Sequence, residues 1–322
     1  MPIILFWIFI AGGQYYVGTD YPSYLQIFNG QGLEQFYDYG EYGFWWITKI
    51  CFENGIKGQA LFFVYYTIGF IFIFLFIRKS KIQYIWIFIL LYITYTSLFN
   101  NQLNGLRQTI SVYIGCVGAL CVISKEYVRG LVLFLIAISF HLTSIIFLLF
   151  FLNKIIVGLT RKQLLVLLGV SLLCSFALSP NLLDEYVDIL PIKYASLIEN
   201  GEIEKNNPIN IISKLLFFPI VLYAMLKMEL MNLSNWERAL FIWGILGFCI
   251  RTAFLGLSLV GRMGMGFLLF SIFPMYYLLV YLRKSNDKNP FYIIIAFLIL
   301  YYFIKVVAFP IGEYDYHNFI FK

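Results

Sequence analysis

The chain has 322 residues, of which 61% are hydrophobic and only 12% are charged, with a formal net charge of +6. A soluble domain carries about 25% charged residues, so this composition excludes a water-exposed surface of normal polarity. The positive charge does not indicate nucleic-acid binding, because the lysines and arginines lie in short segments between apolar stretches, where they orient membrane helices. We therefore expect an all-α integral membrane protein.

Apolar stretches recur along the whole chain, and several reach the roughly 20 residues that a helix needs to cross a bilayer. We predict about ten transmembrane helices in a single membrane domain over 1–322. The first has no basic flank and no cleavage site, which favours a membrane helix over a signal peptide, and its shortness suggests a natural start upstream. The predicted spans are 2–17, 57–77, 82–99, 104–123, 163–179, 209–228, 237–256, 262–282 and 290–309.

Basic clusters between the spans predict the orientation, because loops rich in lysine and arginine stay in the cytoplasm. One apolar stretch, 130–156, remains. If it crossed the membrane once, the basic residues that follow it would lie on the outside. A segment that enters and turns back near His141 keeps both of its basic flanks inside. We therefore predict a re-entrant broken helix there, with a cavity beside it, because a break at membrane depth must be satisfied by protein or water. The basic residues concerned are Arg78, Lys79, Lys81, Lys125, Arg129, Lys154, Arg161, Lys162, Arg283, Lys284 and Lys288.

With this orientation, the polar segments collect on the outer side of the membrane. Two of them, 18–56 and 180–208, are predicted to be external loops. The other outward-facing segments are 100–108, 251–262 and the tail after residue 310.

Three arginines, Arg107, Arg251 and Arg262, lie in or beside apolar helices. An arginine at such a place costs several kcal/mol unless it is paired or wetted, so it is a functional hypothesis by default. If the three converge, their guanidinium groups suit a diphosphate, because each can donate two parallel hydrogen bonds. The alternative for each is an interhelical ion pair or a side chain that reaches the interface.

Amide and aromatic side chains predict contacts with sugars. Asn104 and Gln108 flank Arg107, and amides both donate and accept hydrogen bonds, although a turn also favours asparagine. Tyr21 and Tyr24 belong to an aromatic-rich segment whose rings could stack on sugars. An aromatic belt at the membrane interface explains these rings equally well.

Three titratable side chains are candidates for the chemistry. Asp20 and Glu41 are carboxylates among aromatic residues, where partial burial would raise the pKa of a general base. His141, at the proposed helix break, is a candidate proton acceptor or hydrogen-bond donor. Helix capping or surface solvation of the carboxylates, and a satisfied core histidine, are the alternatives.

Motifs for metals, cofactors and nucleotides are not present in the sequence. Its five cysteines have no metal-ligand spacing and fit small core residues. No phosphate-binding loop or nucleophile elbow occurs. We expect no metal and no cofactor, and an outward-facing sugar site without a nucleotide would need a lipid-linked donor.

Four short motifs, in this order, resemble the EpsG-like family of Wzy-type polymerases of O-antigens, capsules and exopolysaccharides. Two differences are present, since Gln14 stands where the family often has arginine and Tyr42 where it has proline. Beyond about residue 155 only Arg251, Arg262 and the polar tail 314–318 agree. The motifs are Val17-Gly18-Thr19-Asp20-Tyr21 with Tyr24, Glu41-Tyr42-Gly43-Phe44, Asn104-Gly105-Leu106-Arg107-Gln108 and Phe140-His141-Leu142-Thr143-Ser144.

The resemblance implies a fold like the lipid-dependent (GT-C type) glycosyltransferases and a site on the outer face of the bacterial cytoplasmic membrane. It implies transfer of a glycan from undecaprenyl diphosphate to another lipid-linked repeat unit, with a flippase and a chain-length regulator as further partners. Asp20 would be the base, with Glu41 and His141 as substitutes or positioning groups, and the arginines would neutralise the diphosphate. The alternatives are an O-antigen ligase, another lipid-linked glycan transferase, or a non-enzymatic flippase or transporter.

Overall fold

The computed structural model describes residues 2–177, 215–255, 264–310 and 312–321. Within these ranges the chain is helical, apart from one isolated antiparallel β-bridge between Gln14 and Asn318. It divides into two compact units, residues 1–151 with 292–322 and residues 152–291. The all-α prediction is confirmed for the described residues.

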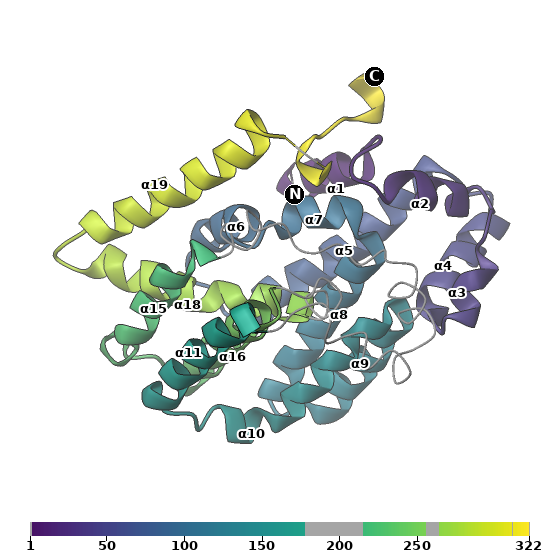
Figure 1. Cartoon of the computed structure of the whole chain (residues 1–322). Coiled ribbons are helices and arrows are strands. Elements are labelled where there is room, and N and C mark those ends of the chain that lie inside the picture. The colour runs from purple at the N-terminus through teal and green to yellow at the C-terminus, as the bar shows by residue number, and fades with distance from the viewer. Residues whose placement is uncertain (1, 178–214, 256–263, 311, 322) are drawn as a thin grey trace. The chain divides into compact units, whose positions relative to one another are not determined.

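The first unit contains the N-terminal helices and the C-terminal end of the chain (Figure 1). Its longest helices, α5 and α8, pack on each other, and α9 packs along α8. The elements are α1 (Pro2–Gly12), α2 (Tyr21–Phe28), α3 (Glu34–Asp38), α4 (Tyr42–Glu53), α5 (Gln59–Lys79), α6 (Ile85–Thr94), α7 (Leu98–Asn104), α8 (Leu106–Ile123), α9 (Tyr127–Phe140), the 3-10 helix η1 (Leu142–Leu152), α19 (Asn289–Phe303), the π-helix η5 (Ile304–Ala308), and the short η6 (Gly312–Tyr314) and η7 (Phe319–Phe321).

The second unit is built around α16 and α18. Ser234 and Glu237 form a reciprocal capping box that starts α16, which satisfies backbone N–H groups that a helix start leaves open. Gly244 allows α16 to approach Pro274 of α18 closely, since a Cβ there would lie 2.4 Å from the proline ring. The elements are α10 (Asn153–Ile156), α11 (Arg161–Ala177), α15 (Phe218–Leu226), η3 (Met228–Met231), α16 (Asn235–Ala253), η4 (Gly264–Phe267) and α18 (Leu268–Lys284).

Four helical segments are long and apolar enough to cross a membrane: Gln59–Lys79, Leu106–Ile123, Gly264–Lys284 and Asn289–Ala308. They correspond to four of the predicted spans. Shorter apolar helices occur at Ile85–Thr94, Tyr127–Phe140 and Leu142–Ile156. The membrane class is therefore supported, whereas about ten spans and a GT-C-like fold stay predictions.

The predicted span 82–99 is divided in the structure. Helix α6 ends at Thr94, and α7 starts at Leu98 after Ser97, which has a φ of +53°. The hydroxyls of Thr94 and Thr96 each donate to the carbonyl four residues earlier, at 2.7 Å. Such bonds compete with the regular helix and often accompany bends, a signal that apolar periodicity does not carry.

A helical hairpin forms at the predicted break. Helix α9 ends at Phe140, His141 is extended, and η1 then runs back along α9. Ring pairs fix the antiparallel direction: Tyr127 meets Phe151 at 6.4 Å and Phe134 meets Phe147 at 5.9 Å. The break near His141 is thus observed, and the chain reverses there. Whether the hairpin is re-entrant in a membrane stays a prediction.

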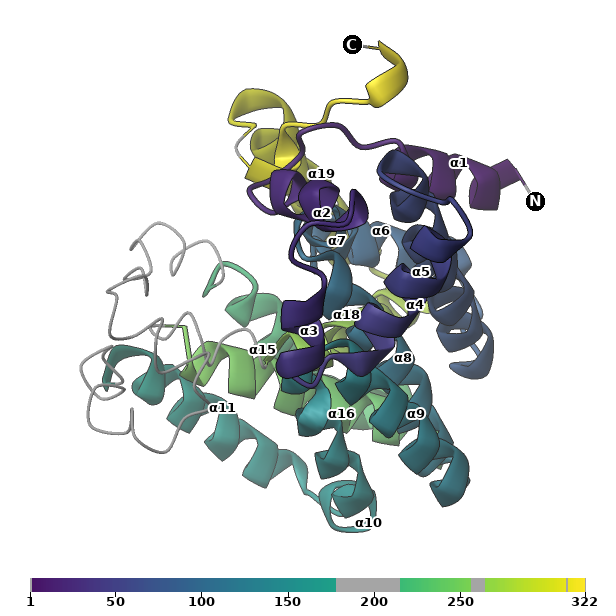
Figure 2. The ribbon, with the colours of Figure 1, turned by 90° about the vertical axis from the view of Figure 1, so that its right-hand side faces the viewer.

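The two chain ends of the first unit are joined. Tyr15 donates its N–H to the His317 carbonyl at 2.9 Å, and the Phe319 N–H donates to the Gly13 carbonyl at 2.9 Å. The Tyr316 hydroxyl donates to the Ile10 carbonyl at 2.8 Å. The C-terminal segment therefore holds the residues that lead from α1 toward α2, as Figure 2 shows.

The predicted external loop 18–56 contains three helices, α2, α3 and α4. Their buried faces pack into one aromatic core with α5, in which Phe28 and Phe44 both stack on Tyr65. This segment is therefore a folded layer. Its external position stays a prediction, and the second predicted loop, 180–208, lies outside the described residues.

Candidate functional site

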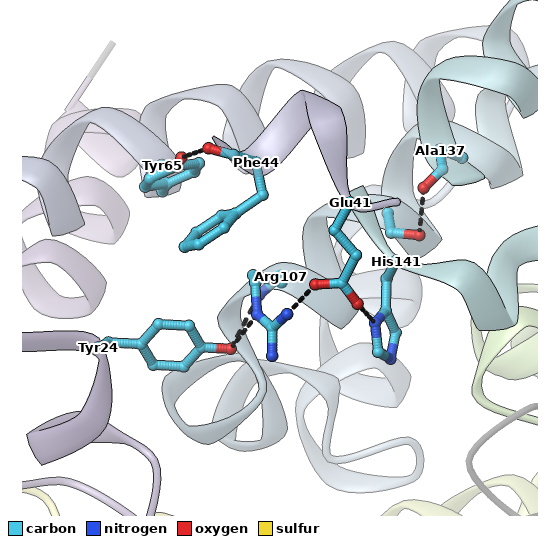
Figure 3. A network of polar contacts seen from close by, with 8 residues as sticks. Tyr24, Glu41, Phe44, Tyr65, Arg107, Ala137 and His141 are labelled. Carbon is cyan, nitrogen blue, oxygen red and sulfur yellow. Dashed lines mark hydrogen bonds and ion pairs between the residues drawn. The ribbon is translucent and has the colours of Figure 1, made fainter. Parts of the chain in front are cut away.

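The candidate site lies where three helix ends meet in the first unit. Glu41 immediately precedes α4, Arg107 lies in the first turn of α8, and His141 immediately follows α9 (Figure 3). These residues come from three of the four motifs found in the sequence.

Glu41 binds both other members of this Glu41–Arg107–His141 cluster. Its Oε2 accepts a hydrogen bond from Arg107 Nη1, and its Oε1 lies 2.9 Å from His141 Nδ1. Only 2% of Glu41 is exposed. A buried carboxylate needs such partners to remain charged. Because each oxygen already has one, Glu41 is better suited to hold Arg107 and His141 than to accept a proton from a substrate.

Arg107 is held by further contacts on the side away from Glu41. Its Nε donates to the Tyr24 hydroxyl at 3.2 Å. The guanidinium carbon lies 4.4 Å from the centre of the Phe36 ring and 5.4 Å from that of Phe44. Flat guanidinium groups stack favourably on aromatic faces, so these rings fix the plane of the charge. The side chain is 16% exposed, which leaves part of it accessible.

Contacts around the helix break position His141. The Ser111 hydroxyl on α8 donates to the Ala137 carbonyl at 2.9 Å and also hydrogen-bonds Ser144 at the start of η1. The same Ala137 carbonyl also accepts the backbone N–H of His141 at 3.1 Å, so these bonds connect α8 to the end of α9 and to the start of η1. Gly43 allows α4 to approach Ser139, where a Cβ would lie 2.4 Å from the hydroxyl. The imidazole is therefore carried by a backbone fixed from two sides.

Asp20 lies at the start of α2 and is exposed. Its backbone N–H donates to Asn104 Oδ1 at 2.9 Å, while its carboxylate makes only a long contact, 3.4 Å, with the Thr19 hydroxyl. The structure thus connects the first motif to the third, next to Arg107. The carboxylate itself is accessible to a substrate.

Tyr21 and Tyr24, predicted to contact sugar, are buried. The Tyr21 ring stacks on Phe62 at 5.0 Å and its hydroxyl donates to Gln59 Oε1 at 2.7 Å. Burial raises the pKa of Tyr21 to about 12, so the hydroxyl keeps its proton at neutral pH and remains a donor. Tyr24 is engaged by Arg107. Sugar contact by these tyrosines stays a prediction.

The remaining predicted residues differ in what the structure says of them. Gln108 is partly exposed on the first turns of α8, and Asn104 ends α7. Arg251 lies in the last turn of α16, in the second unit, and Arg262 lies outside the described residues. Convergence of the three arginines therefore stays a prediction.

Sequence reasoning did not find the aromatic rings around Arg107 or the bonds of Ser111. Phe36 and Phe44 look like ordinary apolar residues, and nothing in their spacing indicates that they face a charge. Ser111 lies inside an apolar helix, where its hydroxyl must find a partner. A serine inside an apolar helix therefore indicates, from the sequence alone, a hydrogen-bond partner for its hydroxyl.

Over the described residues, a helical fold with long apolar helices and a buried ion-paired cluster at helix ends defines a class, the helical membrane proteins. Within that class, the chain belongs to the EpsG family, whose sequence model matches residues 1–320. No curated protein and no solved structure matches the chain.

Proposed function

We propose that this protein is a polysaccharide polymerase that extends lipid-linked glycans at the outer face of the bacterial cytoplasmic membrane. Membership of the EpsG family supports this, because that family is associated with exopolysaccharide polymerases. The observation that carries the proposal is the Glu41–Arg107–His141 cluster, which places a fixed cation and an imidazole together beside the predicted external segment.

In the proposed reaction, a hydroxyl at the non-reducing end of one lipid-linked repeat unit attacks the anomeric carbon of a glycan held on undecaprenyl diphosphate. A new glycosidic C–O bond forms, and the bond between the anomeric carbon and the diphosphate breaks with its electron pair leaving on the diphosphate. The hydroxyl proton passes to a base. The reaction therefore needs a base and a positive charge for the leaving group.

Arg107 is the proposed binding group for the diphosphate. Guanidinium has five N–H donors, of which Nη1 and Nε already contact Glu41 and Tyr24. The two donors of Nη2 have no hydrogen-bond partner within the described residues and suit a phosphate oxygen. Because Glu41 balances the resting charge of Arg107, the site can hold this arginine in a poorly hydrated place until the anion arrives.

Asp20 is the proposed base, and Glu41 is a positioning residue for Arg107 and His141. The exposed carboxylate of Asp20 supports this assignment, since both oxygens of Glu41 are engaged. His141 is the second candidate base, because Glu41 orients its Nδ1 in the way that a carboxylate orients a catalytic imidazole. Arg251 and Arg262 would add positive charge for the diphosphate, and a flippase and a chain-length regulator are the further proposed partners.

Reconstitution tests the proposal. The purified protein in liposomes, supplied with a diphosphate-linked repeat unit, should form products of two or more repeats. Arg107→Ala should lower turnover by about 10²–10³-fold, the usual effect of removing one group that stabilises transition-state charge. Arg107→Lys should restore only part of the turnover, because lysine lacks the paired N–H donors and the flat stacking surface of a guanidinium group.

Arg129→Ala is the matched control, since Arg129 is 79% exposed and pairs with Glu126 at the surface. It should elongate like wild type. If Arg107→Ala and Arg107→Lys both elongate like wild type, the assignment of Arg107 is wrong. If the wild-type protein joins no repeat units, the proposed reaction is wrong.

A further inference from the structure

We infer that Asn104 is a positioning residue that fixes Asp20 relative to Arg107, rather than a residue that contacts the sugar. The inference rests on the proposed function, since it gives Asn104 a task in the same reaction. It also gives a physical link between the first and third motifs, although 84 residues separate Asp20 from Asn104.

The first observation is a short hydrogen bond to one oxygen of Asn104. Asn104 Oδ1 accepts the backbone N–H of Asp20 at 2.9 Å, and the Thr19 hydroxyl lies 3.4 Å from the same oxygen. That hydroxyl also lies 3.4 Å from Asp20 Oδ1, and its single proton serves only one of the two oxygens. The short bond therefore ties this amide oxygen to the backbone of Asp20.

The second observation is the shape of the turn at Gly18. Its φ is +71°, a conformation that residues with a side chain rarely adopt. A Cβ at this position would also lie 2.6 Å from Asn104 Oδ1 and 2.9 Å from Asn104 Cβ. The glycine is therefore required twice, for the backbone conformation and for the space that Asn104 occupies.

The third observation is how Asn104 is joined to Arg107. Asn104 is the last residue of α7, and Gly105 alone separates it from α8, whose first turn carries Arg107. The Tyr24 hydroxyl accepts from Arg107 Nε at 3.2 Å, and Tyr24 lies one helical turn after Asp20 on α2. The start of α2 is thus attached to the α7–α8 junction at two points.

Two attachments fix both the position and the direction of α2, whereas one would allow it to pivot. The Asp20 carboxylate is exposed, and its own contact with Thr19 is long, so its place depends on this backbone connection. A displacement of about 1 Å between reacting groups can lower a rate by about 10²-fold. Asn104 therefore acts on the reaction through Asp20.

The experiment compares Asn104→Ala and Asn104→Asp in the liposome elongation assay, with kcat and KM for the lipid-linked repeat unit measured separately. Alanine removes the acceptor, so kcat should fall by about 10²-fold while KM stays within about twofold. Aspartate has the same shape and supplies an oxygen that accepts the Asp20 N–H, so it should recover most of kcat. A residue that contacts the sugar would instead raise KM in both variants.

Asn101→Ala is the matched control, because Asn101 lies on the same helix, is partly exposed, and keeps its carbonyl bond to the Gly105 N–H. It should retain the wild-type kcat. The thermal midpoint of each purified variant shows whether it is folded, and the recovery with aspartate distinguishes a positioning role from a loss of folded protein.

A double-mutant cycle adds a second readout. Gly18→Ala should lower kcat because the new methyl group displaces the Asn104 side chain. When Asn104 is already alanine, the same change has no acceptor left to displace, so the combined loss should be smaller than the product of the two single losses. Independent effects would multiply and would overturn the inference.

The outcomes separate the inference from the proposed function. If Asp20→Asn abolishes elongation while Asn104→Ala keeps the wild-type kcat, the positioning role is wrong and the function stands. If Asn104→Ala raises KM and leaves kcat unchanged, Asn104 is a substrate contact and the inference is wrong. If Asp20→Asn elongates like wild type, the assignment of Asp20 fails, and the role of Asn104 fails with it.

Discussion

Glu41 connects residues that are far apart in the chain. Arg107 is 66 positions away and His141 is 100 positions away, yet one carboxylate contacts both. Each of the three can be selected from the sequence, because a charged or titratable group beside an apolar helix needs a reason to be there. Their pairing cannot be selected in this way, since it depends on how α4, α8 and α9 end in space.

The substitution Glu41→Gln should destabilise the protein by about 2 kcal/mol. The amide keeps the size of the side chain but leaves Arg107 and His141 as partly buried positive or polar groups without a counter-charge. The measurement is the free energy of unfolding in detergent. The rate of elongation should fall as well, because Arg107 loses the carboxylate contact that holds its guanidinium group in place.

Glu126→Gln is the control for this prediction. Glu126 also has two basic partners, Lys79 and Arg129, and Lys79 lowers the pKa of its carboxyl, but the side chain is 31% exposed. Exposed ion pairs contribute little, so this change should have a far smaller effect on unfolding. Equal losses of unfolding free energy in the two variants would contradict the prediction that the buried contacts of Glu41 contribute more than the exposed contacts of Glu126.

Substitution of each candidate base distinguishes Asp20 from His141. Asp20→Asn and His141→Gln each remove a proton acceptor and leave an amide in its place. Loss of a general base should lower kcat by about 10²–10⁴-fold in the liposome assay. We expect the larger loss with Asp20→Asn, because its carboxylate is exposed to the substrate. A larger loss with His141→Gln would assign the base to His141.

Among the helices, the hairpin of α9 and η1 has the largest consequence for the site, because it determines where His141 lies. Apolar periodicity alone predicts one long span over 130–156, and loop charge predicted the break. The structure explains the break locally: the hydroxyls of Ser111 and Ser144 and the Ala137 carbonyl bond to one another. Such a network depends on α8, so the sequence of the hairpin by itself does not reveal it.

Single-cysteine labelling tests the membrane position of this hairpin. If the hairpin is re-entrant, cysteines at positions 129 and 154 of a cysteine-free variant should react with a membrane-impermeant reagent only from the cytoplasmic side. A cysteine at position 38, in the predicted external segment, should react only from outside. Labelling of positions 129 and 154 from opposite sides would mean that the segment crosses the membrane.

Packing of η1 on α8 predicts a steric effect at Gly115. A Cβ there would lie 2.1 Å from the Phe147 ring, so Gly115→Ala should destabilise the protein by about 1–3 kcal/mol. At Gly169, inside α11, an added Cβ meets no atom of another described segment within 4 Å, and Gly169→Ala should stabilise by about 0.5–1 kcal/mol. Unfolding in detergent measures both. A change in the free energy of unfolding of the same sign for both variants would contradict the packing described for η1.

For the whole molecule, composition alone predicts the class, since a chain with 12% charged residues cannot cover a soluble surface. Apolar windows also locate α5, α8, α18 and α19 well. They fail where backbone and side-chain polar groups compete, as at Thr94–Ser97, and in the segment 18–56, whose three helices form a folded layer. Hydropathy does not detect that layer because its aromatic residues are spread among polar ones.

The proposed function requires that this EpsG-family protein joins lipid-linked repeat units. The glycan length distribution shows whether it does so, measured in a deletion strain that carries the wild-type gene, the Arg107→Ala variant or an empty vector, with expression verified. We predict a ladder of lengths with the wild type, and a single repeat unit on the final acceptor with the vector and with Arg107→Ala. A ladder that persists without the protein, or a vector strain that lacks even the single-repeat species, as the loss of a ligase or flippase would produce, would contradict the claim.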